Sequence, residues 1–154
     1  IGAQRALGHG DRSAAELDTI LLSLIERVAP RLRRAGRSAR TVVLHLRFGD
    51  FARATRSQTL GSPTQRSDLL LAAARESLAA IMPRIERDGI TLIGVSLANL
   101  DDDVQLELPL GPQPPAEALD HTVDAVRDRY GKAAITRAAL LGRDRGIEAP
   151  QLAD

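Results

Sequence analysis

Residues 40–60 read RTVVLHLRFGDFARATRSQTL, and this stretch decides the fold because it predicts a β-hairpin. In residues 40–48 the side chains alternate, which indicates a strand with one buried face. The buried face would hold Val42, Leu44, Leu46 and Phe48, and the other face Val43, His45 and Arg47. Gly49 and Asp50 then turn the chain into residues 51–60, which form the second predicted strand.

A helix is predicted on each side of this hairpin. Ser13 and Glu16 form a capping box, in which each side chain accepts a hydrogen bond from the other residue's backbone amide. Apolar residues then recur at three- and four-residue steps until Gly36, and Pro30 within them predicts a bend or a local restart. A second apolar stripe follows a predicted break at residues 61–63 and contains Pro83. The two stripes are Leu17, Ile20, Leu21, Leu24, Val28 and Leu32, and Leu70, Ala74, Leu78, Ile81 and Ile85.

Two further strands complete the unit. Residues 1–7 suit a short strand, and residues 90–97 are apolar enough for a central strand of a sheet. The predicted order is therefore βαββαβ, an α+β arrangement of the ferredoxin-like type. It places two helices on one face of a four-stranded sheet and leaves the other face as the candidate for function.

The character of the sequence changes after residue 100. Three aspartates, a hydrophobic hexapeptide and a Gly-Pro-rich segment predict a stiff linker over residues 101–115. Beyond it, Leu119, Val123, Val126 and Tyr130 mark a short helix, and residues 133–141 predict another. We expect a domain over residues 1–100, the linker, and a helical or partly disordered tail over residues 116–154.

Composition narrows the class of protein. Of the 154 residues, 44% are hydrophobic and 27% charged, and no apolar run reaches the roughly 18 residues of a membrane span. The absence of cysteine excludes disulfides and thiolate metal sites and favours a cytoplasmic setting. Because the first residue is Ile1 and not Met, we expect part of a longer chain, monomeric as it stands.

Charge is distributed unevenly along the chain. Residues 1–100 hold 15 arginines against 9 acidic residues, whereas residues 101–154 hold 6 basic against 11 acidic residues. Lys132 is the only lysine. Guanidinium groups can bridge phosphate oxygens with paired hydrogen bonds. A GC-rich genome would produce the same arginine bias, so composition leaves both readings open.

No catalytic motif is present. The sequence has no glycine-rich phosphate loop, no HExxH and no GxSxG elbow. His9, His45 and His121 lie on different predicted elements, and residues 101–103 suit a solvated acidic linker better than a cation site. We therefore expect no catalytic residue, metal or cofactor in this chain.

Residues 53–59 are the first candidate for binding. Arginines alternate there with hydroxyl and amide side chains, which hydrogen-bond phosphate oxygens without reading bases. A solvated hairpin face would have the same composition. A period of two does not by itself show which of these side chains point away from the helices.

Four short motifs resemble, in order, the little finger domain of polymerase IV type Y-family DNA polymerases. They are Ile1-Gly2-Ala3, Arg47-Phe48-Gly49-Asp50-Phe51, Thr55-Arg56-Ser57-Gln58-Thr59-Leu60 and Ile93-Gly94-Val95-Ser96-Leu97. In that family the open sheet face grips both DNA backbones in the major groove. The resemblance implies backbone contacts by Ala3, Gln4, Arg5, Arg53, Thr55, Arg56, Ser57, Gln58 and Thr59, although relatives often have a basic residue where Gln58 stands.

The same resemblance implies a parent enzyme. It would be an error-prone translesion polymerase that uses Mg²⁺ in a palm absent from this chain, acts on primer-template DNA at the nucleoid and lacks proofreading. The arginine-rich composition would fit a GC-rich actinobacterium as its source.

Residues 105–110 carry the second resemblance. Gln105, Leu106, Glu107, Leu108, Pro109 and Leu110 look like the hexapeptide by which bacterial polymerases bind the β sliding clamp. An extended peptide would present the Gln105 amide to a polar subsite and leucines to an apolar cleft, while Pro109 prevents a helix. Glu107 fills the variable position. The alternative is a short edge strand, which Pro109 disfavours except at a sheet border.

Three other functions fit the sequence less well. An RNA-recognition-motif-like module shares the βαββαβ order but stacks bases on sheet aromatics, and the predicted strands offer only Phe48 and Phe51. A purely structural or protein-interaction domain would make residues 105–110 incidental. The third is a noncatalytic clamp-binding adaptor of the same family. It would differ from the polymerase only in the catalytic carboxylates of the palm, which lie outside this chain.

Overall fold

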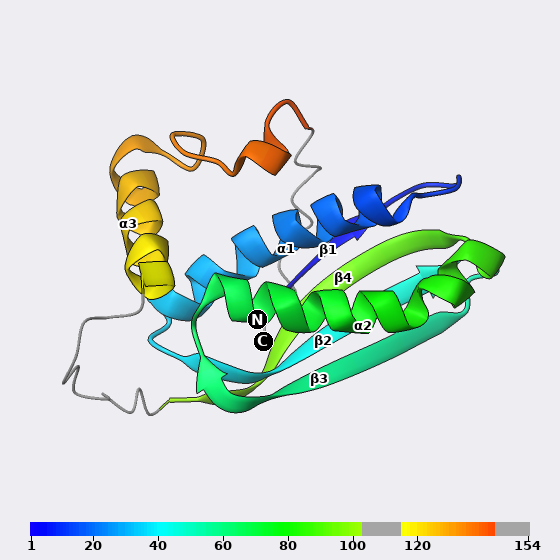
Figure 1. The fold of residues 1–154 in the computed structure, drawn as a ribbon, viewed down its shortest axis with the longest axis horizontal. Helices are drawn as coiled ribbons and strands as arrows, with labels where there is room; N and C mark the ends of the chain where they lie inside the picture. Colours follow the sequence, from blue (N-terminus) through cyan, green and yellow to red (C-terminus); the bar gives the residue numbers. More distant parts are fainter. Residues whose placement is uncertain (103–114, 144–154) are drawn as a thin grey trace.

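The computed structural model describes residues 1–102 and 115–143, which form an α+β domain followed by a helix (Figure 1). Four strands and two long helices alternate in the predicted order, and α3 and a short 3-10 helix, η1, follow. The elements are β1 (Gly2–Ala6), α1 (Ala14–Arg34), β2 (Ser38–Phe48), β3 (Arg53–Thr64), α2 (Ser67–Asp88), β4 (Ile90–Asp101), α3 (Pro115–Tyr130) and η1 (Ala138–Leu140).

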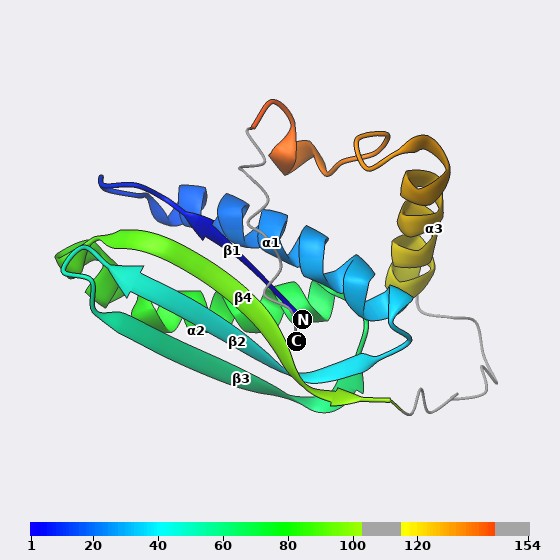
Figure 2. The same cartoon turned by 180° about the vertical axis from the view of Figure 1, so that it is seen from behind.

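The four strands form one antiparallel sheet in the order β1-β4-β2-β3. β4 and β2 occupy the centre, as the apolar sequence of β4 predicts. α1 packs on β1 and β4, and α2 packs on β2 and β3, so both helices cover the same face. Figure 2 shows the sheet from its other side, with both helices behind it. The predicted fold class is confirmed.

The core lies between the helices and the sheet. All four apolar residues predicted for the buried face of β2 are at most 2% exposed, and Phe48 is among the largest fully buried side chains. The α1 stripe is buried at Leu17, Leu21, Leu24 and Val28, and the Ser13–Glu16 capping box is present. Burial of a leucine-sized side chain contributes about 1.5–3 kcal/mol, so each of these side chains stabilises the domain appreciably.

Neither predicted interruption divides its helix or strand. α1 continues through Pro30 without a restart, because Val28, Ala29 and Leu32 are fully buried around it and offset the lost amide hydrogen bond. β3 continues through residues 61–63, where a break was predicted. β3 is an edge strand, where a proline is tolerated, and the register between Thr59 and Thr64 is irregular.

The β2–β3 turn begins at Gly49, and α2 ends beside it. The Gly49 amide donates to the Asp88 carbonyl oxygen at 3.2 Å, and a Cβ at position 49 would lie 2.8 Å from that oxygen. We therefore expect Gly49→Ala to lower the free energy of unfolding by about 1–3 kcal/mol through a forced backbone shift. Gly61→Ala is the matched control, since a Cβ there meets nothing within 4 Å. Equal denaturant midpoints for the two variants would contradict this packing.

The tail is only partly as predicted. The first tail helix is present as α3, but the second, predicted over residues 133–141, is reduced to the three residues of η1. Residues 131–137, which include Gly131, separate the two. The hexapeptide at residues 105–110 lies outside the described residues. Among the described helices, none is both long and apolar enough to cross a membrane.

Candidate nucleic-acid interface

The strand register assigns each side chain to the open or the helix-covered face of the sheet. Neighbouring residues of a strand point to opposite faces, and directly paired residues share a face. Val42 and Leu44 of β2 and Val95 of β4 are buried beneath the helices. Their neighbours along each strand therefore point to the open face. The open face therefore carries Gln4, Thr41, Val43, His45, Arg47, Arg53, Thr55, Ser57, Thr59, Leu92, Gly94 and Ser96.

The residues predicted to contact DNA divide between the two faces. Gln4, Arg53, Thr55, Ser57 and Thr59 lie on the open face. The other four lie on the side of the helices, namely Ala3, Arg5, Arg56 and Gln58.

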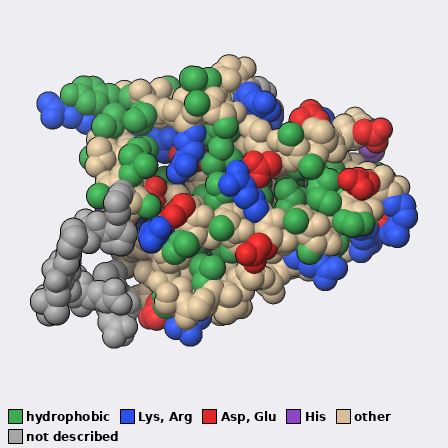
Figure 3. Space-filling model, viewed as in Figure 1, with side chains coloured by type: hydrophobic (Ala, Val, Ile, Leu, Met, Phe, Trp, Pro, Cys, Tyr) green, Lys and Arg blue, Asp and Glu red, His purple; other side chains and the backbone are tan. Residues whose placement is uncertain are grey.

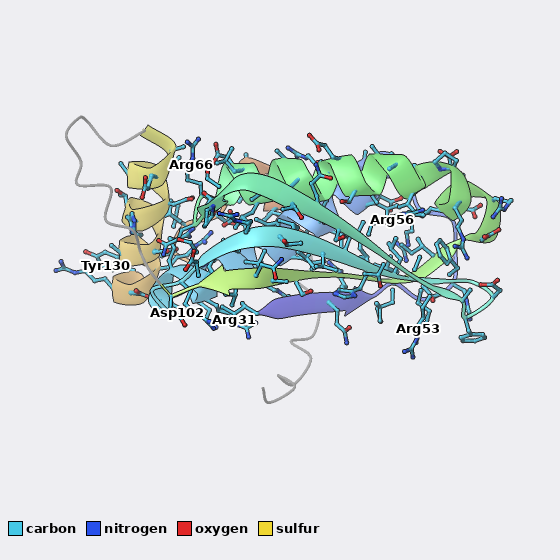
Figure 4. The ribbon with its side chains drawn as sticks, turned by 90° about the horizontal axis from the view of Figure 1, so that it is seen from below. Arg31, Arg53, Arg56, Arg66, Asp102 and Tyr130 are labelled. Atoms are coloured by element: carbon cyan, nitrogen blue, oxygen red, sulfur yellow. The ribbon has the colours of Figure 1, made fainter. Side chains whose placement is uncertain are left out.

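Two observations support this division. Ala3 packs against the core, and the Gln58 amide donates to Glu76 of α2 at 2.9 Å. In Figure 4, Arg53 points away from α2, whereas Arg56 lies on the side of the strand toward it.

The open face is basic. Its strands hold a single acidic residue, Asp101 at the end of β4, and two of their arginines, Arg47 and Arg53, lie on the open face. Arg47 and Arg53 are direct partners across β2 and β3 on the open face. Like charges directly opposite each other destabilise a sheet, so this pair costs stability unless an anion lies between or above them. The arrangement can hold a polyanion.

Sequence reasoning omitted His45, Arg47 and Ser96 from the candidate site. His45 Nε2 lies 2.7 Å from the hydroxyl oxygen of Ser96, which joins the two central strands on the open face. Arg47 donates to the Thr91 hydroxyl oxygen at 3.1 Å, which orients its guanidinium. The signal was present in the sequence, because His45 and Arg47 alternate with the four buried residues of β2.

Close strand packing keeps one part of the open face flat. Gly94 pairs with Gln4, and a Cβ at position 94 would lie 3.0 Å from the Cβ of Gln4. Gly2 faces Ser96 in the same way, at 3.2 Å. The two glycines let β1 lie close against β4, so little side-chain bulk stands between a ligand and the Gln4 amide.

The helix-covered side carries charges of both signs, as the interspersed acidic and basic side chains in Figure 3 show. Arg75 of α2 donates to both carboxylate oxygens of Asp18 of α1, and this hydrogen bonding lowers the pKa of Asp18. The hydrogen bond from Arg66 lowers the pKa of Asp68 in the same way. Paired charges of this kind belong to an ordinary solvated surface, and they contrast with Arg47 and Arg53, which lie opposite each other on the open face.

Arg33 fixes α3 to the end of α1. Its guanidinium donates to Asp124 at 2.6 and 3.1 Å and to Asp120 at 3.3 Å, and the three side chains are 6%, 14% and 10% exposed. The Asp120 carboxylate also accepts the backbone amide of Ser67 at 2.8 Å. Asp120 therefore caps α2 from another helix, because the residue at the N-cap of α2 makes no capping hydrogen bond of its own.

A charge-removing change at Arg33 should release α3. In Arg33→Met the buried carboxylates of Asp120 and Asp124 lose their guanidinium partner. If α3 remained docked, this loss would destabilise the docked state by about 3–5 kcal/mol. We expect α3 to separate and its amides to exchange hydrogen about 100-fold faster, while those of β2 and β4 keep their protection.

The control for that change is Arg34→Met. Arg34 of α1 also pairs with an aspartate of α3, Asp128, but both side chains are at least half exposed. Removing this ion pair should therefore lower the stability of α3 docking by less than about 1 kcal/mol. Unchanged α3 protection in Arg33→Met would show that the network does not hold the helix.

No metal centre accompanies the interface. Within residues 1–102 and 115–143, no group of three or more histidine, aspartate or glutamate side chains could hold a metal ion. The polar side chains of the open face are guanidinium, hydroxyl, amide and imidazole groups.

Comparison with known families places the domain. The model of the impB/mucB/samB family C-terminal domain matches residues 1–108, which include the whole sheet and both helices that cover it. The chain belongs to this family. The impB/mucB/samB match ends within the hexapeptide at residues 105–110 and leaves α3 outside it.

Relatives of this impB/mucB/samB domain are DNA polymerases. DNA polymerase IV 1 of Mesorhizobium japonicum is 35% identical over 156 residues, which cover 98% of this chain and 34% of that protein. DNA polymerase IV of Moorella thermoacetica is 37% identical over 142 residues, covering 92% and 35%. The chain thus spans about a third of the length of these relatives. Neither supports an actinobacterial source.

Solved structures share the fold of this impB/mucB/samB domain. The little finger domain of PolIV, solved in complex with the beta-clamp processivity factor, matches with a TM-score of 0.52 and 23% identity over 73% of this chain and 98% of that one. DinB from Sulfolobus solfataricus matches with a TM-score of 0.55 and 16% identity over 64% of this chain and 28% of that one. The little finger fold expected from the sequence is confirmed.

Proposed function

We propose that the open face of the sheet binds the phosphate backbone of duplex DNA without reading its sequence. The observation that carries this proposal is the pairing of Arg47 with Arg53 on a face whose strands hold one carboxylate, at their far end. Thr55, Ser57 and Thr59 add hydroxyl groups along the same strand, and Gln4 adds an amide. Arginine, hydroxyl and amide side chains are those that proteins use for phosphate oxygens.

This proposal changes the set of predicted contacts. Gln4, Arg53, Thr55, Ser57 and Thr59 remain, and His45 and Arg47 join them. Ala3, Arg56 and Gln58 face the helices and are set aside. Arg5, on the edge strand β1, shares their side of the sheet and is set aside with them.

The whole protein, in this proposal, is an error-prone translesion DNA polymerase of the polymerase IV type. The names of its relatives support this, since each is a DNA polymerase IV. Mg²⁺ would serve nucleotidyl transfer in a part of the polymerase other than this domain, and the protein would act at the nucleoid. The domain contributes its grip on primer-template DNA.

Residues 105–110 would tether this polymerase to the β sliding clamp. The order Gln105-Leu-Glu-Leu-Pro-Leu110 presents one amide and three leucines in an extended peptide, and it directly follows the DNA-binding domain. A structural relative, the little finger domain of PolIV, is solved in complex with the beta clamp. Clamp and DNA binding would then be separable properties of one chain.

An RNA-recognition-motif-like function has lost its structural basis. Phe48 is fully buried, and Phe51 lies in the β2–β3 turn with 68% of its surface exposed. Among the described strands, no phenylalanine, tyrosine or tryptophan side chain lies on the open face, and the His45 ring there is engaged with the Ser96 hydroxyl group at 2.7 Å, so the stacking platform of that module is missing.

A titration of the chain with duplex DNA at increasing salt tests the proposed function. Binding through phosphates releases counterions, so the affinity should fall steeply with salt and should be the same for duplexes of different sequence. An affinity that ignores salt would contradict phosphate contact.

A further inference from the structure

His45 lies on the central strand β2, with its side chain on the open face. It pairs directly with Thr55 of β3 and with Gly94 of β4. Because Gly94 has no side chain, the imidazole ring has room to lie over β4. There its Nε2 atom is 2.7 Å from the hydroxyl oxygen of Ser96. The ring is thus held in one place on the surface proposed to bind DNA.

The Ser96 hydroxyl group can hold this ring in either charge state. A hydroxyl group both donates and accepts hydrogen bonds, so it can donate to a neutral Nε2 or accept from a protonated one. The ring therefore need not move when it gains a proton. Both nitrogens of a protonated imidazole carry a hydrogen, so Nδ1 can donate to an anion while Nε2 stays bonded to Ser96.

Two arginines stand beside the ring on the same face. Arg47 follows His45 by two residues along β2, and Arg53 lies opposite Arg47 on β3. Two residues of a strand span about 7 Å. An anion held by both guanidiniums would therefore lie within one Debye length of the ring, which is about 10 Å at 0.1 M salt.

The sheet itself offers the ring no carboxylate. On the described strands the single acidic residue is Asp101, and its partner on β2 is Ser38, seven residues before His45. Seven residues of a strand span about 23 Å, which is more than two Debye lengths at 0.1 M salt.

The other charged groups near the ring come from α1 and the tail. His45 lines a groove that runs from the open face to these segments, and three carboxylates line it as well. Each carboxylate accepts hydrogen bonds from elsewhere: Glu16 from Ser13, Glu26 from Arg127 and Arg137, and Asp124 from Arg33. The opposite wall also carries cations, among them Arg31 and Arg143. The counter-ion for a charged His45 must therefore be a bound anion.

We propose that His45 takes up a proton when the open face binds the DNA backbone, so that the domain holds DNA more tightly as the pH falls. An imidazole changes its charge between about pH 5 and pH 8. A phosphate beside the ring favours the charged form. By linkage, the protonated chain must then bind DNA more tightly than the neutral one. The inference rests on the proposed function, because the anion is the DNA held on this face.

The test measures blunt-duplex affinity by fluorescence anisotropy at constant low salt, from about pH 8.5 to about pH 5.5. The unmodified chain is compared with His45→Gln, because glutamine is uncharged at every pH and can still bond to Ser96. The control is His9→Gln/His121→Gln, which removes the other two histidines, both exposed and outside the sheet. The α-amino group of Ile1 is common to all three proteins.

The affinity of the unmodified chain and of the control should rise about tenfold over this range, the difference between a charged and a neutral hydrogen bond. His45→Gln should match the unmodified chain at about pH 8.5, which also shows that it is folded, and should lose the rise. Binding enthalpies near neutral pH, measured in two buffers of different ionisation enthalpy, should show proton uptake that disappears in His45→Gln.

Two results would overturn the inference. One is an unmodified chain whose affinity does not change with pH. The other is a rise that survives in His45→Gln or is lost in the control, because another group would then take up the proton. Failure of the duplex to bind at any pH would instead contradict the proposed function itself.

Discussion

Replacing Gln105, Leu106 and Leu110 with alanine should abolish binding to the β sliding clamp. Each leucine buried in an apolar cleft contributes about 1.5–3 kcal/mol, and the hydrogen-bonded amide about 1 kcal/mol. Together they account for about 4–7 kcal/mol, or at least a thousandfold in the dissociation constant. A titration of the 154-residue chain with purified clamp, before and after the triple change, measures this loss.

Two controls make the clamp result specific. Glu107→Ala changes the variable position of the same hexapeptide and should leave clamp affinity within about twofold, as a solvated side chain does. Duplex DNA affinity should be unchanged in the triple variant, since residues 105–110 follow the last strand of the sheet. Clamp affinity that persists in the triple variant would refute the tether.

Charge reversal at Arg47 and Arg53 should nearly eliminate duplex DNA binding. The two guanidiniums face each other on the open face, so Arg47→Glu/Arg53→Glu removes two phosphate contacts and places two carboxylates against the backbone. Each contact to a charged group contributes about 1.5–3 kcal/mol, and repulsion adds to the loss. We expect the dissociation constant to rise about a thousandfold, measured by anisotropy with a blunt duplex.

A variant of equal net charge separates the open face from a general charge effect. Arg56→Glu/Arg87→Glu makes the same change in charge, but Arg56 lies on the opposite face of β3 and Arg87 on α2. Its affinity should fall by less than about tenfold, through long-range repulsion only. If the two double variants lose the same affinity, the open face is not the binding surface. A circular dichroism melt of each checks that both remain folded.

The sequence predicts β2 better than β3, for a physical reason. β2 is central and one of its faces is buried, so Val42, Leu44, Leu46 and Phe48 alternate with the less buried Val43, His45 and Arg47. That alternation also identifies His45 and Arg47 as open-face residues. β3 is an edge strand with polar side chains on both faces, and its burial pattern gives no such contrast. The faces of Arg53 and Arg56 therefore follow only from the register with β2.

The docking of α3 lies beyond sequence reasoning. Its apolar stripe predicts a helix, and the helix is present, but Leu119 and Tyr130 are exposed. α3 is held instead by Asp120 and Asp124, whose partner Arg33 lies about 90 residues earlier, since 124 and 33 are 91 apart. The periodicity of apolar residues along a helix cannot predict an ion pair between residues so far apart in the sequence. Charge counts alone would have assigned the acidic tail to solvent.

The most direct test of the open-face account is the salt dependence of duplex binding in the unmodified chain and in Arg47→Glu/Arg53→Glu. The slope of log affinity against log salt is about −0.9 for each phosphate contacted, so the unmodified chain should give a steep negative slope. Loss of two contacts should make the slope of the double variant shallower by about two. A slope near zero for the unmodified chain, or the same slope for both proteins, would contradict phosphate binding by this face.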